Sequence, residues 1–567
     1  MKQFFRDGDE PTPSQVTQRR INSWDIHLMG ELGVVYKMDA PSCSVMQGDT
    51  QNRDTKKPNA VVKLPKLDLR GAGIMLPISA LPSRHGIGTF GEAAHQFLRE
   101  LTNAGQQYWQ VLPLLPTPSC NSPFQSFSAF AGNCYFIDLD ILVSKGLLKE
   151  DEIAPFVDQS DTINYGRIYA TRRPILQKAF ARANKVGKSK EAERFEEENA
   201  EWLESYCLYR AIKAHFGDKP WMEWPEAIRW ADKGAKKEYA RNLADEIAFW
   251  KFCQFEFENQ WQALKANATK SGIAIIGDCP LYVSLDSADV WEQRHLFKVE
   301  KNGNVKASAG VPPDAYSDME RCWGNPLYDW PEMERENFTW WKKRMKRNAC
   351  LYNIIRIDHF IGLRRFYKIH TEPDECHLNR WEDAPGLAIA EVIEAAAKEE
   401  GGTILAEDLG LITPDVREVL EKIGWQGMKV LQFAFDGKLH NDHLPHNYKT
   451  HRNVVYPSTH DNETLQSYLH ESYPEKREQA LEYTNTTLPE EIVWNIHRLA
   501  YMSIADTVII LMQDILELDN SARTNIPGKT NGWCWRLKEG QFTKVHQARL
   551  RKLAETYGRL PSQKNHR

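Results

Sequence analysis

Three short motifs place an acidic residue at the end of an apolar, strand-like run. They are Arg356-Ile-Asp-His359, Ala406-Glu-Asp-Leu-Gly410 and Ser458-Thr-His-Asp-Asn462. Acidic side chains in such places can simply cap the helices that follow. Three carboxyl groups at three run ends, two of them beside Arg or His, favour one shared catalytic site instead. The candidate catalytic residues are therefore Asp358, Glu407 and Asp461.

Arg356 and Asp358 are separated by one residue, so on an extended strand their side chains lie on the same face. The guanidinium group favours the ionised form of the carboxyl group, which a nucleophile requires. Glu407 needs the opposite, a raised pKa, if it is to deliver a proton. Two carboxyl groups on neighbouring strands fit a retaining glycosidase, in which they lie about 5 to 5.5 Å apart.

Eight short apolar runs must hold these residues, and amphipathic helical stretches separate most of them. This alternation predicts a parallel sheet, and the near-continuous apolarity of the runs predicts that both faces of the sheet are covered. We expect an α/β fold, a (β/α)8 TIM barrel, with an open doubly wound sheet as the alternative. In a barrel, catalytic groups lie at the carboxyl ends of the strands. The predicted strands are Gly73–Ile78, Tyr108–Leu112, Ile273–Asp278, Asn353–Asp358, Thr403–Glu407, Lys429–Ala434, Asn453–Pro457 and Thr507–Met512, and clear helical stretches are Glu92–Ala104, Leu387–Glu400 and Pro414–Ile423.

Changes in composition divide the chain into three parts. Residues 1–69 are polar without a sustained period and are expected to form an N-terminal extension. Residues 70–540 are expected to form the catalytic barrel, with a mainly helical insertion at about 140–270, and residues 541–567 a C-terminal helix and tail. The basic run Lys342–Arg347 is predicted to be a solvated helix face.

The chain has 567 residues, 42% hydrophobic and 26% charged, which is typical of a soluble globular protein. Its net charge of −5 shows no nucleic-acid footprint, and its apolar runs are far shorter than the roughly 18 residues that span a bilayer. Its ten cysteines include no Cys-x-x-Cys pair, and residues 1–10 lack the apolar core of a secretory signal. We expect a cytoplasmic protein, a monomer or homodimer, without nucleic-acid or membrane partners.

The segment Gly86-Ile-Gly-Thr-Phe-Gly91 spells the dinucleotide-binding pattern and raises the alternative of a nucleotide-dependent oxidoreductase. However, the stretch Ser79–His85 separates it from the preceding strand, and no acidic residue ends the next strand to bind a ribose. These glycines more plausibly shape a tight loop.

Four histidines, at positions 440, 443, 446 and 451, follow the sixth predicted strand. A metal site is conceivable, but neither their spacing nor the acidic residues around them match a known metal cage. A surface loop at the barrel mouth is the preferred interpretation. Cys279 and Cys322 are predicted to be packing residues, because no G-x-S-x-G or similar nucleophile motif accompanies them.

The three acidic motifs resemble those of glycoside hydrolase family 77, the 4-α-glucanotransferases, also called amylomaltases or disproportionating enzymes. The resemblance covers about residues 71–540. Further ordered blocks that match are Gln106–Pro113, Ser126–Asn133, Gly277-Asp278, Asp286–Trp291, Gly310–Asp314, Trp323–Tyr328 and Leu444–Tyr448.

The resemblance implies that Asp358 is the nucleophile, Glu407 the general acid/base and Asp461 the group that stabilises the oxocarbenium-like state. It places Trp323 on a loop that folds over the bound glucan. It also implies that the substrates are α-1,4-glucans and maltooligosaccharides and that no metal or organic cofactor is needed. The residues expected to line the donor subsite are Arg356, Asp278, His460 and Asn525.

Two departures from the family pattern concern substrate binding. Phe124 stands in Ser122-Pro-Phe-Gln125 where members usually carry tyrosine, so a stacking ring remains and a hydroxyl is lost. The loop Asp318–Cys322 also differs. We expect Phe124, Trp323 and either Tyr108 or Trp109 to meet sugar. Alternatives that stay open are a plain α-glucan hydrolase and a catalytically inactive glucan-binding protein.

Overall fold

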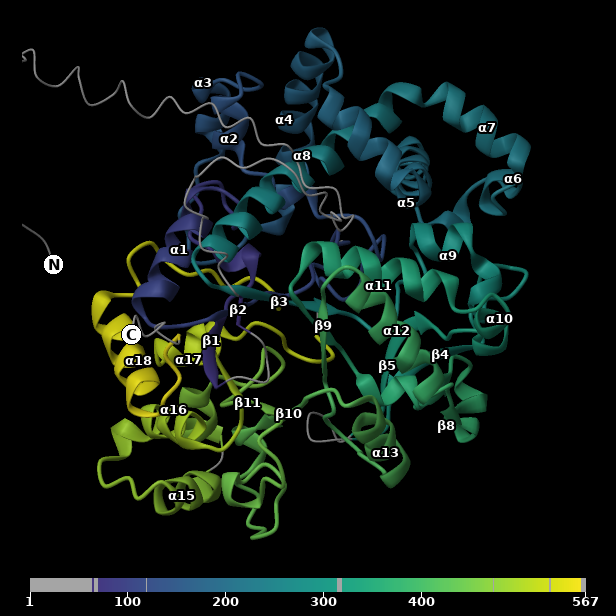
Figure 1. Ribbon diagram of the computed structural model, residues 1–567. Helices are drawn as coiled ribbons and strands as arrows, with labels where there is room; N and C mark the ends of the chain where they lie inside the picture. The colour runs from purple at the N-terminus through teal and green to yellow at the C-terminus, as the bar shows by residue number, and fades with distance from the viewer. Residues whose placement is uncertain are drawn as a thin grey trace, which may run out of the picture. The chain divides into compact units, whose positions relative to one another are not determined.

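The computed structural model describes residues 64–65, 70–118, 120–313, 319–472, 474–529 and 532–561, all within the compact unit Thr50–Arg567 (Figure 1). Nearly all of the expected N-terminal extension, residues 1–69, lies outside these described residues. Among the helices described, none is both long and apolar enough to cross a bilayer.

Eight parallel strands form the central sheet, in the order β10-β11-β12-β1-β2-β3-β6-β9. Their residues are almost all buried, as in Thr507–Leu511, because helices cover the outer face of a closed barrel and strand side chains fill its interior. Each strand overlaps one of the eight predicted runs. The strands are β1 (Gly71–Met75), β2 (Tyr108–Gln110), β3 (Ala274–Cys279), β6 (Ile354–Ile357), β9 (Thr403–Ala406), β10 (Gly427–Val430), β11 (Asn453–Tyr456) and β12 (Thr507–Leu511).

The sheet closes on itself between β9 and β10. Leu405 and Gln426 form a parallel bridge, and the Ala406 amide donates to the Gln426 carbonyl at 2.9 Å. The expected (β/α)8 barrel is therefore confirmed, and the open doubly wound alternative is wrong. The position of β10 was predicted about two residues too late, because its apolar run continues without a break into a 3-10 turn at Leu431–Phe433.

Three barrel helices agree closely with the predicted stretches: α1 (Glu92–Asn103), α12 (Leu387–Glu399) and α13 (Pro414–Ile423). Further helices are α11 (Thr339–Leu351), α16 (Ile492–Met502) and α18 (Lys544–Thr556). In α13, Pro414 occupies the first helical position and Gly424 ends the helix in the left-handed conformation, with a φ of 76°. These two residues mark both ends of the helix in the sequence.

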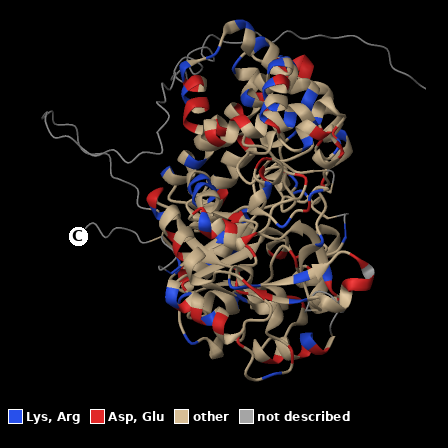
Figure 2. Ribbon diagram, turned by 90° about the vertical axis from the view of Figure 1, so that its right-hand side faces the viewer, with Lys and Arg blue, Asp and Glu red and all other residues tan. Residues whose placement is uncertain are grey.

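A layer of helices connects β2 to β3. It contains α2 (Leu139–Ser144), α3 (Glu150–Ile153), α4 (Tyr165–Val186), α5 (Lys190–His215), α6 (Glu226–Arg229), α7 (Lys233–Asn242) and α8 (Ala244–Lys270). Figure 2 shows acidic and basic residues interspersed over these helices. Most of their buried residues are apolar, and Trp221 and Trp224 are fully buried among them.

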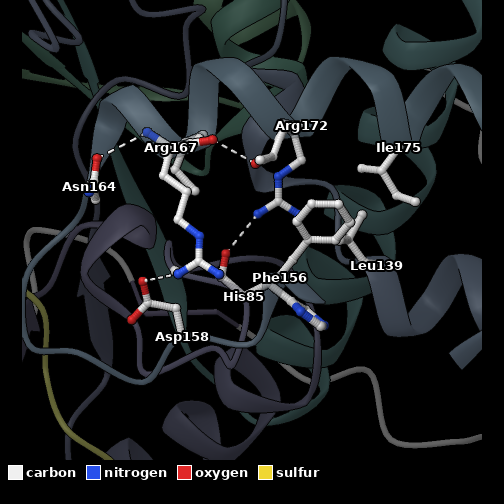
Figure 3. Close-up of a pocket in the computed structure, with 11 residues that line it drawn as sticks. His85, Leu139, Phe156, Asp158, Asn164, Arg167, Arg172 and Ile175 are labelled. Carbon is white, nitrogen blue, oxygen red and sulfur yellow. Dashed lines mark hydrogen bonds and ion pairs between the residues drawn. The ribbon is translucent and has the colours of Figure 1, made fainter. Parts of the chain in front are cut away.

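A small pocket marks the junction between α4 and the loop that follows β1 (Figure 3). Within it, Arg167 pairs with Asp158 at 2.9 Å, and buried Arg172 donates to the His85 carbonyl at 3.0 Å. These contacts join the helical layer to the barrel. None of the residues that line the pocket belongs to the predicted site.

A second sheet of four antiparallel strands, in the order β5-β4-β7-β8, was not predicted. It comprises β4 (Ala307–Val311), β5 (Arg321–Pro326), β7 (Arg365–His370) and β8 (Arg380–Asp383). Charged residues interrupt β7 and β8, and β4 and β5 consist largely of small or polar residues, so the sheet lacks the apolar runs by which strands were sought. Two of them lie between β3 and β6 in the chain and two between β6 and β9, so the sheet extends the loops at the carboxyl ends of β3 and β6.

The prediction of a solvated face for Lys342–Arg347 is wrong for three of its six residues, Arg344, Met345 and Arg347, which are buried. Arg344 is 1% exposed and donates to the Leu281 carbonyl at 3.0 Å, and buried Arg347 donates to the Phe130 carbonyl at 3.1 Å. Both arginines occupy the inner face of α11, where carbonyls of loop segments accept their hydrogen bonds. Only Lys342 is fully exposed.

Candidate active site

The three candidate carboxyl groups lie at the same end of the barrel. Asp358 directly follows β6, Glu407 directly follows β9, and Asp461 lies in the loop after β11. Because β6 and β9 are paired neighbours, Asp358 and Glu407 leave adjacent strands at the same edge of the sheet. This is the end of a barrel where catalytic groups occur.

Asp358 is held from inside the barrel by Arg356. One guanidinium nitrogen, Nη1, lies 3.0 Å from Asp358 Oδ1 and 2.8 and 2.7 Å from the two oxygens of Asp278, the register partner of Arg356 on β3. The Asp278 side chain is 0% exposed, whereas that of Asp358 is 26% exposed. Of the two aspartates bound to Arg356, Asp358 is therefore the one that can reach a substrate. Asp278 acts on the site through Arg356.

The pKa values of these two aspartates reflect burial against a shared cation. Burial raises the pKa of Asp278 to about 7 even though Arg356 opposes the rise. Burial also raises the pKa of Asp358, and again the Arg356 charge opposes it. The pKa of Asp358 is therefore not lowered as expected from Arg356 alone, because burial outweighs the guanidinium charge.

Glu407 is held by backbone amides instead of a cation. The His359 amide donates to Glu407 Oε2 at 2.6 Å, and the Leu409 amide donates to Oε1 at 3.1 Å. Burial raises the pKa of Glu407 well above its ordinary value, the charge of Arg356 opposes the rise and the charge of Asp358 adds to it. A raised pKa favours the protonated form that a general acid requires.

The backbone of His359 makes the first of these contacts possible. His359 adopts a left-handed conformation with a φ of 49°, which is unfavourable for a residue with a side chain. The turn carries the chain from Asp358 to an amide that points at Glu407. The two carboxyl groups are thus linked through consecutive residues.

Asp461 is clamped by a segment far along the chain. The Asn525 side-chain amide donates to Asp461 Oδ1 at 2.5 Å, and Arg523 donates to the Asp461 carbonyl at 2.7 Å. The Asn525 backbone amide donates to the His460 carbonyl at 3.0 Å. Burial alone would raise the pKa of Asp461, but His460, the Asn525 amide and the Arg356 charge outweigh it, so this pKa lies below its ordinary value.

Two aromatic side chains border the carboxyl groups. Phe124 stacks on His460 with a centroid distance of 5.4 Å and an interplanar angle of 7°, and lies 5.7 Å from Trp533. Trp323 meets the His359 ring edge-on at 4.9 Å. Both rings are partly exposed, as a sugar-contacting ring must be.

Tyr108 and Trp109 do not reach the site, and the prediction that one of them meets sugar is wrong. Both are 0% exposed on β2, a strand covered on both faces. Trp109 packs edge-on against Phe97 at 5.1 Å and donates to the Leu76 carbonyl at 2.9 Å. They belong to the matching block Gln106–Pro113 because both side chains form part of the barrel core.

Several residues at the site were missed from the sequence. His359, Arg523 and Trp533 make the contacts described above, and Gln125 and Asn325 join the loops that carry Phe124 and Trp323. Gln125 stands beside Phe124 and Asn325 lies in the Trp323–Tyr328 block, so both were within reach of the motif argument. Nothing in the sequence marks Trp533.

The glycine-rich segment forms a tight loop, as expected. A Cβ atom at Gly88 would lie 1.7 Å from the Ile78 carbonyl oxygen, and one at Gly91 would lie 2.1 Å from an Asp138 carboxylate oxygen. Asp138 thus stands beside the residue that precedes α1, where a dinucleotide would need its phosphates. This geometry argues against the oxidoreductase alternative.

The four histidines have separate partners. His443 accepts from the Val430 amide at 3.1 Å, His446 bonds the Tyr483 hydroxyl at 2.7 Å, and His451 pairs with Asp506 at 2.8 Å beside the start of β12. His440 and His446 are exposed, as expected of a surface loop, but His451 lies near the amino ends of the strands, away from the barrel mouth.

Of the two cysteines predicted to pack, Cys279 is buried, whereas Cys322 is exposed on β5 and that prediction is wrong.

A closed barrel of parallel strands, with carboxyl groups in contrasting environments at its carboxyl end, characterises a (β/α)8 enzyme of the glycoside-hydrolase type. Residues 76–543 match the model of glycoside hydrolase family 77, described as 4-alpha-glucanotransferase. The chain belongs to this family.

Similar proteins extend over most of the chain. The 4-alpha-glucanotransferase of Streptococcus pneumoniae is 41% identical over 498 residues, which are 87% of this chain and 98% of that protein. That of Thermus thermophilus is 41% identical over 501 residues, 87% of this chain and 99% of that protein. The solved structure of the amylomaltase from Streptococcus agalactiae in complex with acarbose has a TM-score of 0.82 at 34% identity, and covers 87% of this chain and 100% of that one.

Proposed function

We propose that this protein is a 4-α-glucanotransferase, which moves α-1,4-glucan segments from a donor to the 4-hydroxyl of an acceptor glucan or glucose with retention of configuration. Family membership supports the reaction. The observation that carries the mechanism is the contrast between two carboxyl groups on neighbouring strands. Asp358 is bonded to the Arg356 cation, whereas Glu407 is buried and held only by amides.

In the first half of the reaction, an Asp358 oxygen attacks the anomeric carbon of the donor, and the glycosidic bond from that carbon to the departing 4-oxygen breaks. Glu407 gives its proton to this oxygen. The product is a β-glycosyl ester of Asp358 and a shortened glucan. Asp461, which is partly exposed and has a lowered pKa, stabilises positive charge at the anomeric carbon as the bond breaks.

In the second half, the 4-hydroxyl of an acceptor attacks the anomeric carbon while its proton passes to ionised Glu407. The ester bond to Asp358 breaks and the α-1,4 linkage is restored. Two inversions give net retention. Water can replace the acceptor, and transfer prevails only where an acceptor is held at high effective concentration and water is kept out.

Donor binding is proposed for residues that frame the carboxyl groups. Asn525 fixes Asp461, and His460 lies beneath the Phe124 ring. Arg356 and Asp278 are too deeply buried for broad contact with sugar. Their role is to orient Asp358 and to favour its ionised form. Phe124 and Trp323 would stack on glucose rings from two different loops.

Incubation with maltotriose followed by chromatography tests this function. Glucose together with a ladder of longer maltooligosaccharides is the expected result. Glucose and maltose alone, with one new reducing end for each bond broken, would show a plain hydrolase. Asp358→Asn must abolish turnover; unchanged product formation by that variant would remove Asp358 from the mechanism, and an inactive wild-type protein that still binds glucan would support the binding-protein alternative.

A cytoplasmic location and a monomeric or homodimeric state are also proposed. The cysteines of the described residues are all free, which suits a reducing compartment. Cell fractionation and light scattering test these two proposals.

A further inference from the structure

The regular pairing between β4 and β5 is interrupted at Trp323. Gly310 of β4 pairs with Cys322 of β5, but Ser308, two residues away on β4, pairs with Pro326, four residues away on β5. The extra residues of β5 therefore form a bulge around Trp323. Bulges of this kind commonly re-aim a side chain beside an active site.

Gln125 supplies hydrogen bonds that the sheet does not give this bulge. Its Nε2 donates to the Trp323 carbonyl at 3.0 Å and to Asn325 Oδ1 at 2.9 Å. Asn325 Nδ2 donates to Gln125 Oε1 at 3.4 Å and to the Val283 carbonyl at 2.7 Å. The two amides thus join three segments: the Phe124 loop, the loop after β3 and the bulge of β5.

The Trp323 ring fixed in this way contacts the catalytic carboxyl region. It packs edge-on against the His359 ring at 4.9 Å and lies 6.0 Å from the Tyr282 ring. The His359 amide in turn donates to Glu407 at 2.6 Å. A continuous series of contacts therefore runs from the Gln125 amide, through Trp323 and His359, to the general acid/base.

We propose that Gln125 is a positioning residue for glucan transfer: its amide completes the β5 bulge, holds Trp323 against His359, and so favours an acceptor glucan over water at the glycosyl-enzyme. This inference rests on the proposed function. In either outcome the Asp358 ester bond breaks and one proton passes to Glu407. What Gln125 controls is whether the new bond to the anomeric carbon forms from a sugar 4-hydroxyl or from a water molecule.

Two variants of Gln125 and one matched control test the proposal in the full-length protein. Gln125→Leu keeps the approximate volume of the side chain and removes every hydrogen bond. Gln125→Glu keeps an acceptor for Asn325 but cannot donate to the Trp323 carbonyl. The control is Gln547→Leu, because Gln547 is similarly an amide donor to a carbonyl, that of Phe542 at 3.0 Å, but belongs to the remote helix α18.

The readouts are the initial rates of maltopentaose formation and of new reducing ends from maltotriose, with the melting temperature measured in parallel. Loss of two hydrogen bonds to the bulge in Gln125→Glu, and of three in Gln125→Leu, predicts that the ratio of hydrolysis to transfer rises about 10-fold in both variants. In Gln547→Leu the ratio of hydrolysis to transfer should equal that of the wild type, even if the melting temperature of this variant falls as far as that of the Gln125 variants.

A ratio within about twofold of wild type in a folded Gln125 variant overturns the inference. Should Gln125→Leu not fold, Gln125→Glu alone decides the result. Failure of the proposed function has a different signature, because the wild-type protein would then make no maltopentaose at all.

Discussion

Arg356 and Asp358 form an ion pair that connects the barrel interior to the carboxyl group facing the substrate. The Arg356 nitrogen that bonds Asp358 at 3.0 Å is the same atom that bonds both oxygens of Asp278. The charge of the exposed aspartate therefore depends on a cation that it shares with a fully buried one.

Arg356→Met should reduce kcat/KM for maltotriose by at least about 100-fold, because it leaves two carboxyl groups without their cation. Loss of the positive charge raises the pKa of Asp358, so the acidic limb of the pH profile should move to higher pH. Arg364→Met is the control, since Arg364 pairs with Asp383, whose side chain is 76% exposed. An acidic limb that stays in place would show that Arg356 does not set the charge of Asp358.

Glu407→Gln should slow turnover of maltotriose by about 10³-fold, because the variant can neither give nor take a proton. With α-maltosyl fluoride, whose leaving group needs no proton, the first step should survive and the maltosyl ester of Asp358 should accumulate. Intact-protein mass spectrometry detects the added maltosyl group. Its absence in Glu407→Gln, or its presence in Asp358→Asn, would contradict the assigned roles.

Phe124→Tyr tests the departure of this chain from the family pattern. The Phe124 ring stacks on His460 and is partly exposed. A new hydroxyl that bonds substrate should lower KM for maltotriose by up to about fivefold with little change in kcat. Phe124→Ala should raise KM, because the stacking surface is lost. A higher KM in Phe124→Tyr would mean that the ring edge faces protein.

Asp514→Asn should flatten the pH dependence of stability. Asp514 is fully buried, where it accepts hydrogen bonds from the Ser458 hydroxyl and, at 2.9 Å, from the Leu465 amide, and burial raises its pKa to about 6.

The sign follows from proton uptake on folding. Between about pH 4 and pH 6 folded Asp514 keeps a proton that the unfolded chain has lost, so stability falls as pH rises through this range, by at most about 3 kcal/mol. Urea unfolding at pH 4 and pH 7 measures this decline. If Asp514→Asn declines as steeply as the wild type, another group is responsible.

Gly277→Ala should destabilise the barrel next to Asp278. A Cβ atom at Gly277 would lie 2.1 Å from the Tyr352 ring, whose hydroxyl accepts from the Leu114 amide at 3.2 Å. We expect a loss of about 3 kcal/mol in the free energy of unfolding, measured from the urea midpoint. Gly166→Ala in α4 is the control: its nearest neighbour is 3.5 Å away, so the variant should be neutral or slightly stabilised.

The barrel could be predicted from the sequence because its elements repeat one physical pattern. A strand such as Thr507–Leu511 is apolar after its first residue, since both its faces are buried, and a helix such as Pro414–Ile423 is bounded by proline and glycine. The antiparallel sheet lacks this signal: β7, Arg365–His370, mixes arginine, lysine and histidine with its apolar residues. Arg344 was likewise predicted to lie on the surface because it is charged. Hydropathy does not indicate that backbone carbonyls inside the protein accept its hydrogen bonds.

The three acidic residues of the site could be located because strand ends converge at one edge of a barrel. Of the contacts around them, the Arg356–Asp358 pair could be predicted from its spacing, but contacts between distant segments could not. Asn525 reaches Asp461 across 64 positions, and Gln125 reaches Asn325 across 200. Such pairs depend on loop conformations that leave no periodic trace in the sequence.

One bridge between β9 and β10 closes the barrel and forms a seam that divides the catalytic rim into two parts. Asp358 and Glu407 stand on β6 and β9, which share a four-residue ladder, while Asp461 belongs to the arc that starts at β10. We expect opening at this seam to change the spacing between Asp461 and the other two acids more than the spacing between Asp358 and Glu407. The two carboxyl groups proposed to break and form the glycosidic bond are thus joined by a continuous ladder, whereas the proposed stabiliser of the charged intermediate state lies across the seam from them.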